Sequence, residues 1–395
     1  MGAIGTPDLK LRMALDGRFV ASVRIRGAMK KIRYAVVGLG HIAQVAVLPA
    51  FQHAENSELV ALITGDADKQ KALGKKYGVP AYPYDDFERA LREERADAVY
   101  IALPNTQHRE YTCSAAAGGV HVLCEKPMAT TEEDCRAMIE ACAAADVRLM
   151  IAYRLHFTDA HRRAVELARS GKLGELRYFN SLFALQVADG NIRVRRATGG
   201  DTVFDIGIYC LNAARYFFQD EPVEVIATTA SIDERRFSEI EEMTSVVLRF
   251  PKERLASFVC SFGSVDMDQL DLVGTEGPLR MEPAYEYAGE LKWRIKLGKE
   301  ETGRTFSGGD QFAAELIYFS DCIREGREPE PSGTEGLADV RIINAIYESA
   351  RCGKPVKIEP VHKHTRPRKA QEIKRPPVKK PETVGASSPH KAGTA

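Results

Sequence analysis

Two glycines near the start of the chain narrow the range of folds that this sequence can adopt. Residues Arg33–Val37 are rich in strand-forming residues and lead directly into Gly38-Leu39-Gly40-His41-Ile42-Ala43. Apolar residues at helical spacing follow, so the glycines stand between a predicted strand and a predicted helix. Glycines there permit a tight turn and close approach of the backbone to a pyrophosphate, whose charge the helix amides favour. The pattern predicts a dinucleotide site at Gly38, Gly40, His41 and Ile42, with a plain strand-to-helix turn as the alternative.

The second predicted strand, Leu59–Ile63, does not end in the carboxylate that usually holds the ribose hydroxyls of NAD. It ends at Thr64-Gly65, and Lys69 follows one helical turn later. A hydroxyl, a flexible glycine and an ammonium would accept a 2′-phosphate, which an acidic residue would repel. We therefore expect NADP rather than NAD, although Asp66 and Asp68 stand close by and their orientation bears on this preference.

Polar residues follow the next two predicted strands. The apolar run Ala98–Leu103 stops at Pro104-Asn105-Thr106-Gln107-His108, and Val120–Cys124 stops at Glu125-Lys126-Pro127. The carboxyl ends of parallel strands are where open α/β sheets bind ligands. We expect cofactor contacts from the residues at these two ends, namely Leu103, Pro104, Asn105, His108, Glu125 and Lys126. Helix capping by the first group and a solvated Glu-Lys pair in the second are the alternatives.

A further buried strand, Arg148–Ala152, runs into Tyr153-Arg154-Leu155-His156, where the chain is expected to cross into a second domain. If this segment is extended, Arg154 and His156 point to the same face. We expect Arg154 to contact the cofactor and His156 to contact the substrate. The basic stretch that begins at Arg193 is either a solvated loop or a further contact to the substrate.

An apolar helical segment near the middle of the chain carries two polar groups, Asp205 and Tyr209. At a spacing of four residues they lie one above the other on one helix face. A carboxylate one turn from a phenol is not needed for packing, so both are candidate site residues. The alternative is a helix-capping aspartate next to an unrelated buried tyrosine.

Four short alternating strands between residues 223 and 274 predict a largely antiparallel sheet with one open face, and two amphipathic helices, Gln311–Arg324 and Thr334–Ala350, follow. We therefore expect four segments. Residues 1–30 form an arm, 31–152 an N-terminal Rossmann domain with a doubly wound parallel sheet, 153–360 a substrate and dimerisation α/β domain, and 361–395 a disordered, basic, proline-rich tail.

Composition excludes several classes of function. Lysine plus arginine equals aspartate plus glutamate, 55 against 55, so no overall charge favours nucleic acid. The 8 cysteines show no C-x-x-C pair and no metal-ligand spacing, and no window is apolar enough to span a membrane. The first thirty residues lack the apolar core of a signal peptide. We expect a cytoplasmic protein without a bound metal.

Five motifs in order resemble those of the Gfo/Idh/MocA oxidoreductase family, and most closely its glucose–fructose oxidoreductase branch. They are Ala35-Val36-Val37-Gly38-Leu39-Gly40, Ala98-Val99-Tyr100-Ile101-Ala102-Leu103-Pro104-Asn105, Cys124-Glu125-Lys126-Pro127-Met128-Ala129-Thr130, Tyr153-Arg154-Leu155-His156 and Asp205-Ile206-Gly207-Ile208-Tyr209. The resemblance implies a Rossmann domain followed by an open-sheet α/β domain, assembled as a homodimer or homotetramer. It carries the family's catalytic lysine to Lys126, its aspartate to Asp205 and its histidine-or-tyrosine position to Tyr209.

The resemblance and the residues together predict an NADP-dependent oxidoreductase that moves a hydride between nicotinamide and C1 of an aldose. Tyr209 is the expected acid/base, Lys126 stabilises its phenolate and the substrate oxygen, and Asp205 orients substrate or tyrosine. The alternatives are glucose–fructose transhydrogenation with tightly held NADP, oxidoreduction of a trans-dihydrodiol or dicarbonyl sugar, and a non-catalytic sugar- or NADP-sensing regulator. The branch's proline-rich arm has no clear counterpart in residues 1–30, and Ile192 replaces an expected tryptophan.

Overall fold

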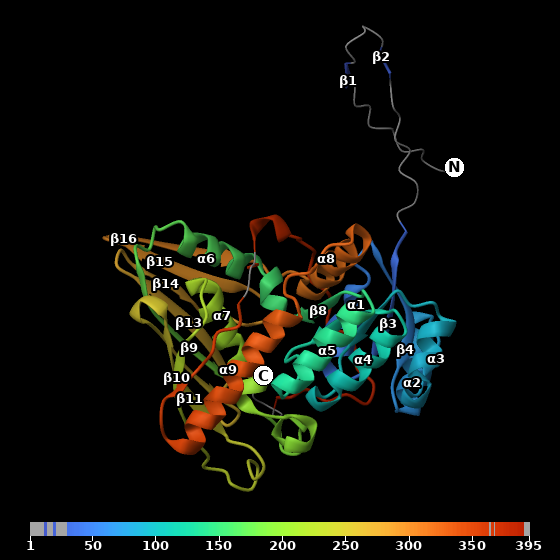
Figure 1. Cartoon of the computed structure of the whole chain (residues 1–395), viewed down its shortest axis with the longest axis horizontal. Coiled ribbons are helices and arrows are strands. Elements are labelled where there is room, and N and C mark those ends of the chain that lie inside the picture. The colour runs from blue at the N-terminus through green and yellow to red at the C-terminus, as the bar shows by residue number, and fades with distance from the viewer. Residues whose placement is uncertain (1–11, 14–18, 21–29, 363–364, 367, 391–395) are drawn as a thin grey trace. The chain divides into compact units, whose positions relative to one another are not determined.

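The computed structural model describes residues 12–13, 19–20, 30–362, 365–366 and 368–390. The chain divides into two units, Met1–Lys31 and Ile32–Ala395. In the first unit the described residues form one antiparallel pair of short strands, β1 (Arg12–Met13) and β2 (Phe19–Val20). The second unit contains the remaining described helices and strands (Figure 1).

The first half of the second unit is built on a parallel sheet. Its six strands lie in the order β5-β4-β3-β6-β7-β8. Their bounds are β3 Ile32–Val37, β4 Ser57–Ile63, β5 Ala81–Tyr82, β6 Ala98–Ile101, β7 His121–Glu125 and β8 Leu149–Ala152. The chain winds outward on one side of β3 and then returns to continue on the other side. The carboxyl ends of β3 and β6 therefore flank the point where the winding reverses, which is where such sheets bind ligands.

Helices cover both faces of this sheet. After the two glycines the chain forms one π-helical segment, η1 (Ala43–Val47), which continues into α1 (Leu48–Ala50). The other helices are α2 (Ala67–Tyr77), α3 (Phe87–Glu93), α4 (His108–Ala117) and α5 (Glu132–Ala144). Strands β3 and β6 are buried almost throughout, as expected of a parallel sheet covered on both sides.

The second half contains a nine-stranded sheet with the order β16-β15-β14-β13-β9-β12-β11-β10-β17. Its central pair β9–β12 is parallel and its other pairs are antiparallel. The bounds are β9 Leu176–Ala184, β10 Glu224–Ala230, β11 Met243–Phe250, β12 Arg254–Ser261, β13 Met267–Gly274, β14 Pro278–Met281, β15 Leu291–Leu297, β16 Glu300–Phe306 and β17 Val356–Lys357. Alternating burial along β11 and β12 gives the sheet one buried face and one that faces outward.

Three helices pack on the buried face of this sheet, α6 (Asp159–Arg169), α7 (Ile208–Phe218) and α9 (Gly333–Cys352) (Figure 1). Helix α8 (Gln311–Glu325) packs instead on the parallel sheet, where the Ser320 hydroxyl lies 2.8 Å from the Tyr34 phenol oxygen. Helix α7 continues a π-helical segment, η7 (Val203–Gly207). The 3-10 helices are η2 Tyr84–Asp86, η3 Asn105–Gln107, η4 Arg154–Phe157, η5 Ile192–Val194, η6 Arg196–Thr198, η8 Pro251–Glu253 and η9 Lys369–Gln371. The predicted fold class, a parallel Rossmann sheet joined to a mostly antiparallel open sheet, is confirmed.

Two local expectations differ from the structure. Residues 154–157 form a 3-10 helix rather than an extended segment, because the chain turns sharply into α6 there. The C-terminal segment is also not a freely solvated tail over its described residues. Arg366 pairs with Glu221 at 2.5 Å, and Arg375 donates to the carbonyl oxygen of His53 at 3.0 Å. Basic residues of this segment bind carboxylates and carbonyl oxygens on the protein surface. Composition alone does not predict these contacts.

Candidate active site

The glycine loop has the shape that a dinucleotide requires. Gly38 has a φ of +89°, and a Cβ there would lie 2.4 Å from the carbonyl oxygen of Ala102, so only glycine fits this turn. A Cβ on Gly40 would meet no atom within 4 Å, so open space lies in front of this backbone. His41 and Ile42 follow at the helix start, and the buried Nδ1 atom of His41 has no hydrogen-bond partner among the described residues. These features fit a pyrophosphate lying against the loop.

The end of β4 presents the groups predicted to select NADP. Thr64 is buried at the strand end, and its hydroxyl accepts a long hydrogen bond from the amide of Asp66 at 3.4 Å. Asp66 caps α2 by accepting from the amide of Lys69 at 3.0 Å, and the Lys69 ammonium lies 3.8 Å from the same carboxylate. Asp66 is thus committed to its own helix and partly neutralised, which leaves Thr64, Gly65 and Lys69 compatible with a 2′-phosphate.

Lys126 and Asp205 meet although 79 residues separate them in the sequence. The Lys126 ammonium donates to the Asp205 carbonyl oxygen at 2.7 Å and to its carboxylate Oδ1 at 3.1 Å. Arg193 Nε donates to the other carboxylate oxygen at 2.6 Å. Lys126, Asp205 and Arg193, which stand in separate parts of the sequence, therefore form one cluster at the carboxyl end of β7.

Tyr209 completes this cluster. Its ring centroid lies 4.9 Å from the Lys126 ammonium nitrogen. Its phenol oxygen accepts a hydrogen bond from Nε of Arg154 at 3.0 Å, and the Arg154 guanidinium also lies over the ring. Asp205 and Tyr209 thus face the same site, as the four-residue spacing predicts, although the helix passes through the π-helical segment η7 between them.

The charges of the cluster reinforce one another. Burial by itself would raise the pKa of Asp205, but Arg193 and Lys126 outweigh it and hold that pKa well below its usual value. Burial by itself would lower the pKa of Lys126, but the nearby Tyr209, Asp205 and Glu125 outweigh it and raise that pKa. Lys126 is therefore a cation and Asp205 an anion at neutral pH, so the site presents a fixed positive charge beside a phenol.

The structure does not bring every predicted residue into the cluster. His156 is buried away from it, with Nδ1 3.5 Å from the Tyr216 phenol and its ring beside Phe157. His108 is fully buried, with its two ring nitrogens 2.9 Å from carbonyl oxygens of Leu103 and Pro127. Both histidines are packed inside the protein, so the direct contacts predicted for them do not match their positions.

The remaining predicted residues lie around the cluster. Asn105 donates to the carbonyl oxygen of Gly199 at 2.8 Å, which ties the end of β6 to the loop before η7. Leu103 is buried and Pro104 follows it on the same turn. Glu125 accepts from the Tyr100 phenol at 2.8 Å, and burial raises its pKa. These residues position the strand ends on which Lys126 stands.

Sequence reasoning missed two residues that hold Arg154 in place. Arg154 donates from its two terminal nitrogens to the side-chain oxygen of Gln311 at 3.2 Å and to the Tyr285 carbonyl oxygen at 2.5 Å. Gln311 opens α8 and Tyr285 follows β14, so both are distant in sequence. Their local patterns carry no signal for this role, since each residue is common in a helix or loop.

The C-terminal segment reaches the glycine loop. The amide of Val384 donates to the side chain of Gln44 at 2.7 Å, and Gln44 donates back to the Val384 carbonyl at 2.8 Å. A Cβ on Gly385 would lie 3.1 Å from Cε of Lys69. Further along, His390 lies 2.7 Å from a carboxylate oxygen of Asp266 in the second half of the unit. The segment therefore runs from the glycine loop and Lys69 to Asp266, between strands β12 and β13 of the nine-stranded sheet.

Comparison with known proteins agrees with this geometry. Residues 32–153 match a family model described as an oxidoreductase family with an NAD-binding Rossmann fold, and residues 161–280 match the GFO/IDH/MocA C-terminal domain. The chain is similar to D-xylose 1-dehydrogenase [NADP(+)] of Haloarcula marismortui, with 30% identity over 83% of this chain and 93% of that protein. D-xylose 1-dehydrogenase (NADP(+)) 2 of Haloferax volcanii is 32% identical over 82% of this chain and 99% of that protein.

A solved structure is also similar. The aldose-aldose oxidoreductase from Caulobacter crescentus, complexed with glycerol, superposes with a TM-score of 0.79. The two sequences are 40% identical, and the match covers 83% of this chain and 100% of that one. The likeness thus extends over the whole of that protein.

Proposed function

Because the chain belongs to the Gfo/Idh/MocA oxidoreductase family, we propose that it is an NADP-dependent enzyme that oxidises an aldose at C1 to a lactone or catalyses the reverse reaction. The convergence of Lys126, Asp205 and Tyr209 carries this proposal, since three separate motifs supply a cation, an anion and a phenol to one place. The NADP specificity named for the xylose dehydrogenases agrees with the groups at the end of β4.

The residues divide the chemistry between them. When bound, NADP supplies the acceptor for the hydride that leaves the sugar carbon. Tyr209 acts as the phenolate, which Lys126 and Arg154 stabilise, and it becomes the neutral phenol when it receives the hydroxyl proton of the substrate. Lys126 also attracts the negative charge that develops on the substrate oxygen as its proton leaves. Asp205 holds the Lys126 ammonium in place and, with Arg193, offers polar contacts to sugar hydroxyls.

Absorbance at 340 nm tests this proposal directly. Purified protein with NADP and a panel of aldoses is expected to produce NADPH, and the matched variant Lys126→Met is expected to be inactive on the same panel. Binding of NADP without turnover of any aldose would contradict the proposal and would favour a sugar- or NADP-sensing regulator.

Transhydrogenation between two aldoses is a second candidate function. The 40% identity to an aldose-aldose oxidoreductase favours it, as does the contact of the C-terminal segment with Gln44 beside the glycine loop. In that case a mixture of aldoses with no added NADP would give lactone and alditol in equal amounts, with no lasting change at 340 nm. A strict requirement for added NADP would exclude this alternative and leave the dehydrogenase.

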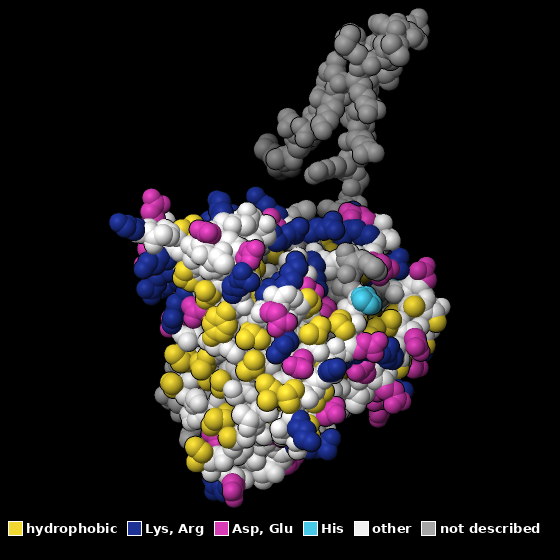
Figure 2. Space-filling view, turned by 60° about the vertical axis from the view of Figure 1, so that its left-hand side comes forward, with side chains coloured by type: hydrophobic (Ala, Val, Ile, Leu, Met, Phe, Trp, Pro, Cys, Tyr) yellow, Lys and Arg dark blue, Asp and Glu magenta, His cyan; other side chains and the backbone are white. Residues whose placement is uncertain are grey.

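The outward face of the nine-stranded sheet supports an assembly of two or four chains. Large apolar side chains are exposed there in cross-strand pairs, Ile226 with Val247 and Leu255 with Tyr178. Figure 2 shows several hydrophobic groups gathered on this side of the molecule. A contiguous apolar surface of this kind marks a protein interface. Light scattering is expected to give a dimer or tetramer, and Val247→Glu is expected to dissociate it.

We also propose that the protein is located in the cytoplasm. All eight cysteines are free thiols, which suits a reducing compartment. Among the described residues, no helix combines the length and the apolar character needed to cross a membrane. The division into a dinucleotide-binding part at 31–152 and a substrate-binding part at 153–360 belongs to the same proposal.

A further inference from the structure

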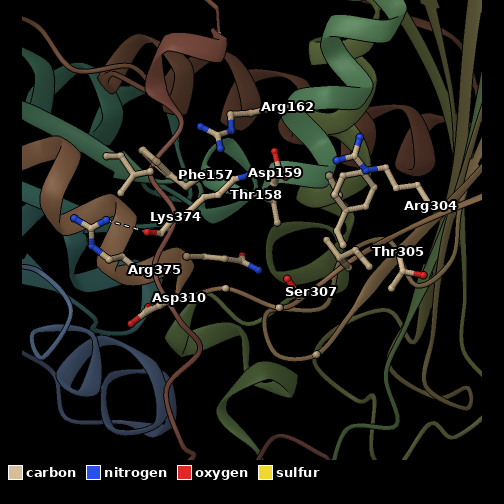
Figure 3. Close-up of a pocket in the computed structure, with 18 residues that line it drawn as sticks. Phe157, Thr158, Asp159, Arg162, Arg304, Thr305, Ser307, Asp310, Lys374 and Arg375 are labelled. Atoms are coloured by element: carbon tan, nitrogen blue, oxygen red, sulfur yellow. Dashed lines mark hydrogen bonds and ion pairs between the residues drawn. The ribbon is translucent and has the colours of Figure 1, made fainter.

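A cavity of about 300 Å³ lies outside the Lys126 cluster, where the start of α6, the start of α8 and the C-terminal segment meet (Figure 3). Its lining is strongly basic, with contributions from Arg162, Arg304, Lys374 and Arg375. This volume is at the lower end of the range for small-molecule sites. The family motifs do not include these residues, and the proposed reaction does not use them.

Arg162 is the most unusual residue of this lining. Its side chain comes from the first turn of α6 and is only 5% exposed. All three of its guanidinium nitrogens are buried and have no hydrogen-bond partner among the described residues. Burial lowers the pKa of this guanidinium. A buried cation whose donors make no hydrogen bond destabilises the folded protein unless an anion or ordered water satisfies it.

The acidic residues of the cavity are already engaged elsewhere. Asp159 accepts from Nε of Arg163 at 2.8 Å and pairs with Lys374 at 3.5 Å. Asp310 caps α8 by accepting from the amide of Ala313 at 2.9 Å, and its second oxygen lies 3.0 Å from His53 Nδ1. Neither carboxylate hydrogen-bonds to Arg162, although Asp159 and Glu372 lie close enough to favour its charge. Lys374 pairs with Glu372 and Arg375 with Glu55. Arg162 is therefore the buried lining cation whose hydrogen-bond donors stay unused among the described residues.

The backbone adds to this positive field. Helix α6 has 11 residues, and its N-cap residue Thr158 makes no side-chain cap bond. The Thr158 hydroxyl donates instead to the Leu155 carbonyl oxygen at 2.8 Å. The first amides of α6 therefore lack a capping side chain, at the helix end that carries the positive end of the dipole. Arg162 and these amides belong to the same helical turn, which borders the cavity (Figure 3).

We propose that this cavity binds a phosphate-class oxyanion, with the Arg162 guanidinium and the first amides of α6 as its ligands. Arginine forms paired hydrogen bonds to phosphate oxygens, and a helix start offers further donors. The anion comes either as free phosphate or as the phosphoryl group of a small metabolite, since the cavity volume admits both. The ligand would supply the hydrogen bonds that the described residues do not give to this guanidinium.

The cavity also touches the candidate active site through one side chain. Gln311 lines the cavity, and its side-chain oxygen accepts from Arg154, whose Nε donates to the Tyr209 phenol. Two hydrogen bonds thus separate a cavity-lining residue from the proposed acid/base.

Calorimetric titration of the full chain tests this site. Inorganic phosphate is titrated into protein saturated with NADP, so that the dinucleotide site cannot take up the anion. A titration of chloride at equal ionic strength into the same protein is the control. Wild-type protein is expected to bind one phosphate per chain, and Arg162→Met is expected to weaken binding at least tenfold. Arg169→Gln, an exposed arginine on the same helix, is the matched control and keeps wild-type affinity.

The thermal unfolding midpoint gives a second measurement, which does not depend on a calorimetric binding signal. In phosphate-free buffer Arg162→Met is expected to unfold at a higher temperature than wild type, because the substitution removes an unpaired buried charge. Added phosphate is expected to raise the midpoint of the wild type alone. An equal response in both proteins, or no response beyond that of chloride, would overturn the proposal.

Two further titrations identify the source of the anion. Binding of inorganic phosphate without binding of D-glucose 6-phosphate supports a site for the free ion. Tighter binding of D-glucose 6-phosphate than of phosphate, with no binding of D-glucose, supports a phosphorylated metabolite. Failure of both phosphate ligands overturns the site and leaves the proposed oxidoreductase function untouched, because turnover of aldoses is measured separately.

Discussion

One helical segment carries two ionic clusters, and the contrast between them separates a candidate active site from a structural core. Asp205 lies in η7 within the cluster around Lys126, and Arg215 lies further along α7 in a second cluster. Arg215 is fully buried and donates to Glu221 at 2.6 Å and 3.0 Å and to Glu335 at 2.6 Å. It also pairs with Asp339. Both clusters join groups that are distant in sequence.

The two clusters differ in what they leave available. The Lys126 and Asp205 side chains keep 11% and 19% of their surface exposed, whereas those of Arg215, Glu335 and Asp339 keep none. Lys126 has three donors, and two of them are used among the described residues. Buried charge alone therefore does not identify a site. A ligand must also be able to reach the site, and a hydrogen-bond donor must be free to bind that ligand.

Loss of the Lys126 charge is expected to have the largest effect. Lys126→Met should lower kcat by roughly 10³-fold or more, because it removes the fixed cation beside the reacting oxygens. The free energy of unfolding in urea should change little, since the Lys126 side chain is partly exposed. Steady-state kinetics beside a urea titration measures both. A large loss of stability with normal kcat would assign Lys126 to the structural class.

The opposite outcome is expected at Arg215. Arg215→Met leaves three carboxylates without their shared partner and should lower the free energy of unfolding by roughly 3–5 kcal/mol. The kcat of the fraction that remains folded should stay within about twofold of the wild type. Urea unfolding and active-site titration of the same sample provide the check, and a selective loss of kcat would break the comparison.

The phenol at the Lys126 cluster gives the next largest effect. Tyr209→Phe removes the proton acceptor but keeps the ring, so kcat should fall by roughly 10²-fold while NADPH affinity is retained. Fluorescence titration with NADPH measures the affinity independently of turnover. If kcat is unchanged, the acid/base role passes to Lys126.

Replacing Lys69 should have a smaller effect, on the preference for NADP over NAD. Lys69→Ala removes the ammonium near Thr64 and should lower the ratio of kcat/KM for NADP over NAD by about tenfold. Lys75→Ala, near the far end of the same helix, is the matched control. Equal loss in the two variants would show that the 2′-phosphate is held elsewhere.

The smallest expected effect is a change in acid stability. Burial would raise the pKa of Glu221, but Arg215 and Arg366 outweigh it and lower that pKa in the folded protein. Its stabilisation is thus complete above the unfolded-state pKa of about 4.3 and is lost as the pH falls through the lower folded value. Glu221→Gln should show a flatter decline in unfolding midpoint below pH 5 than the wild type. Parallel declines would place the acid sensitivity elsewhere.

Much of the candidate site follows from local sequence patterns. Gly38 and Gly40 stand between a strand and a helix, and that context alone predicts the turn and its open side. Lys126 ends a buried strand, and Asp205 and Tyr209 share a helix face because four residues make about one turn. Each of these features depends only on residues that are neighbours in the chain.

The tertiary structure decided which of these groups meet and which are enclosed. Arg154 holds the Tyr209 phenol across 55 residues, Arg193 reaches Asp205, and Arg162 is left unpaired beside a cavity. His108 and His156, by contrast, look like site residues in the sequence and are buried in the core. Periodicity fixes the direction of a side chain relative to its own element only. Its partners and exposure depend on how distant elements pack, and no local pattern records that packing.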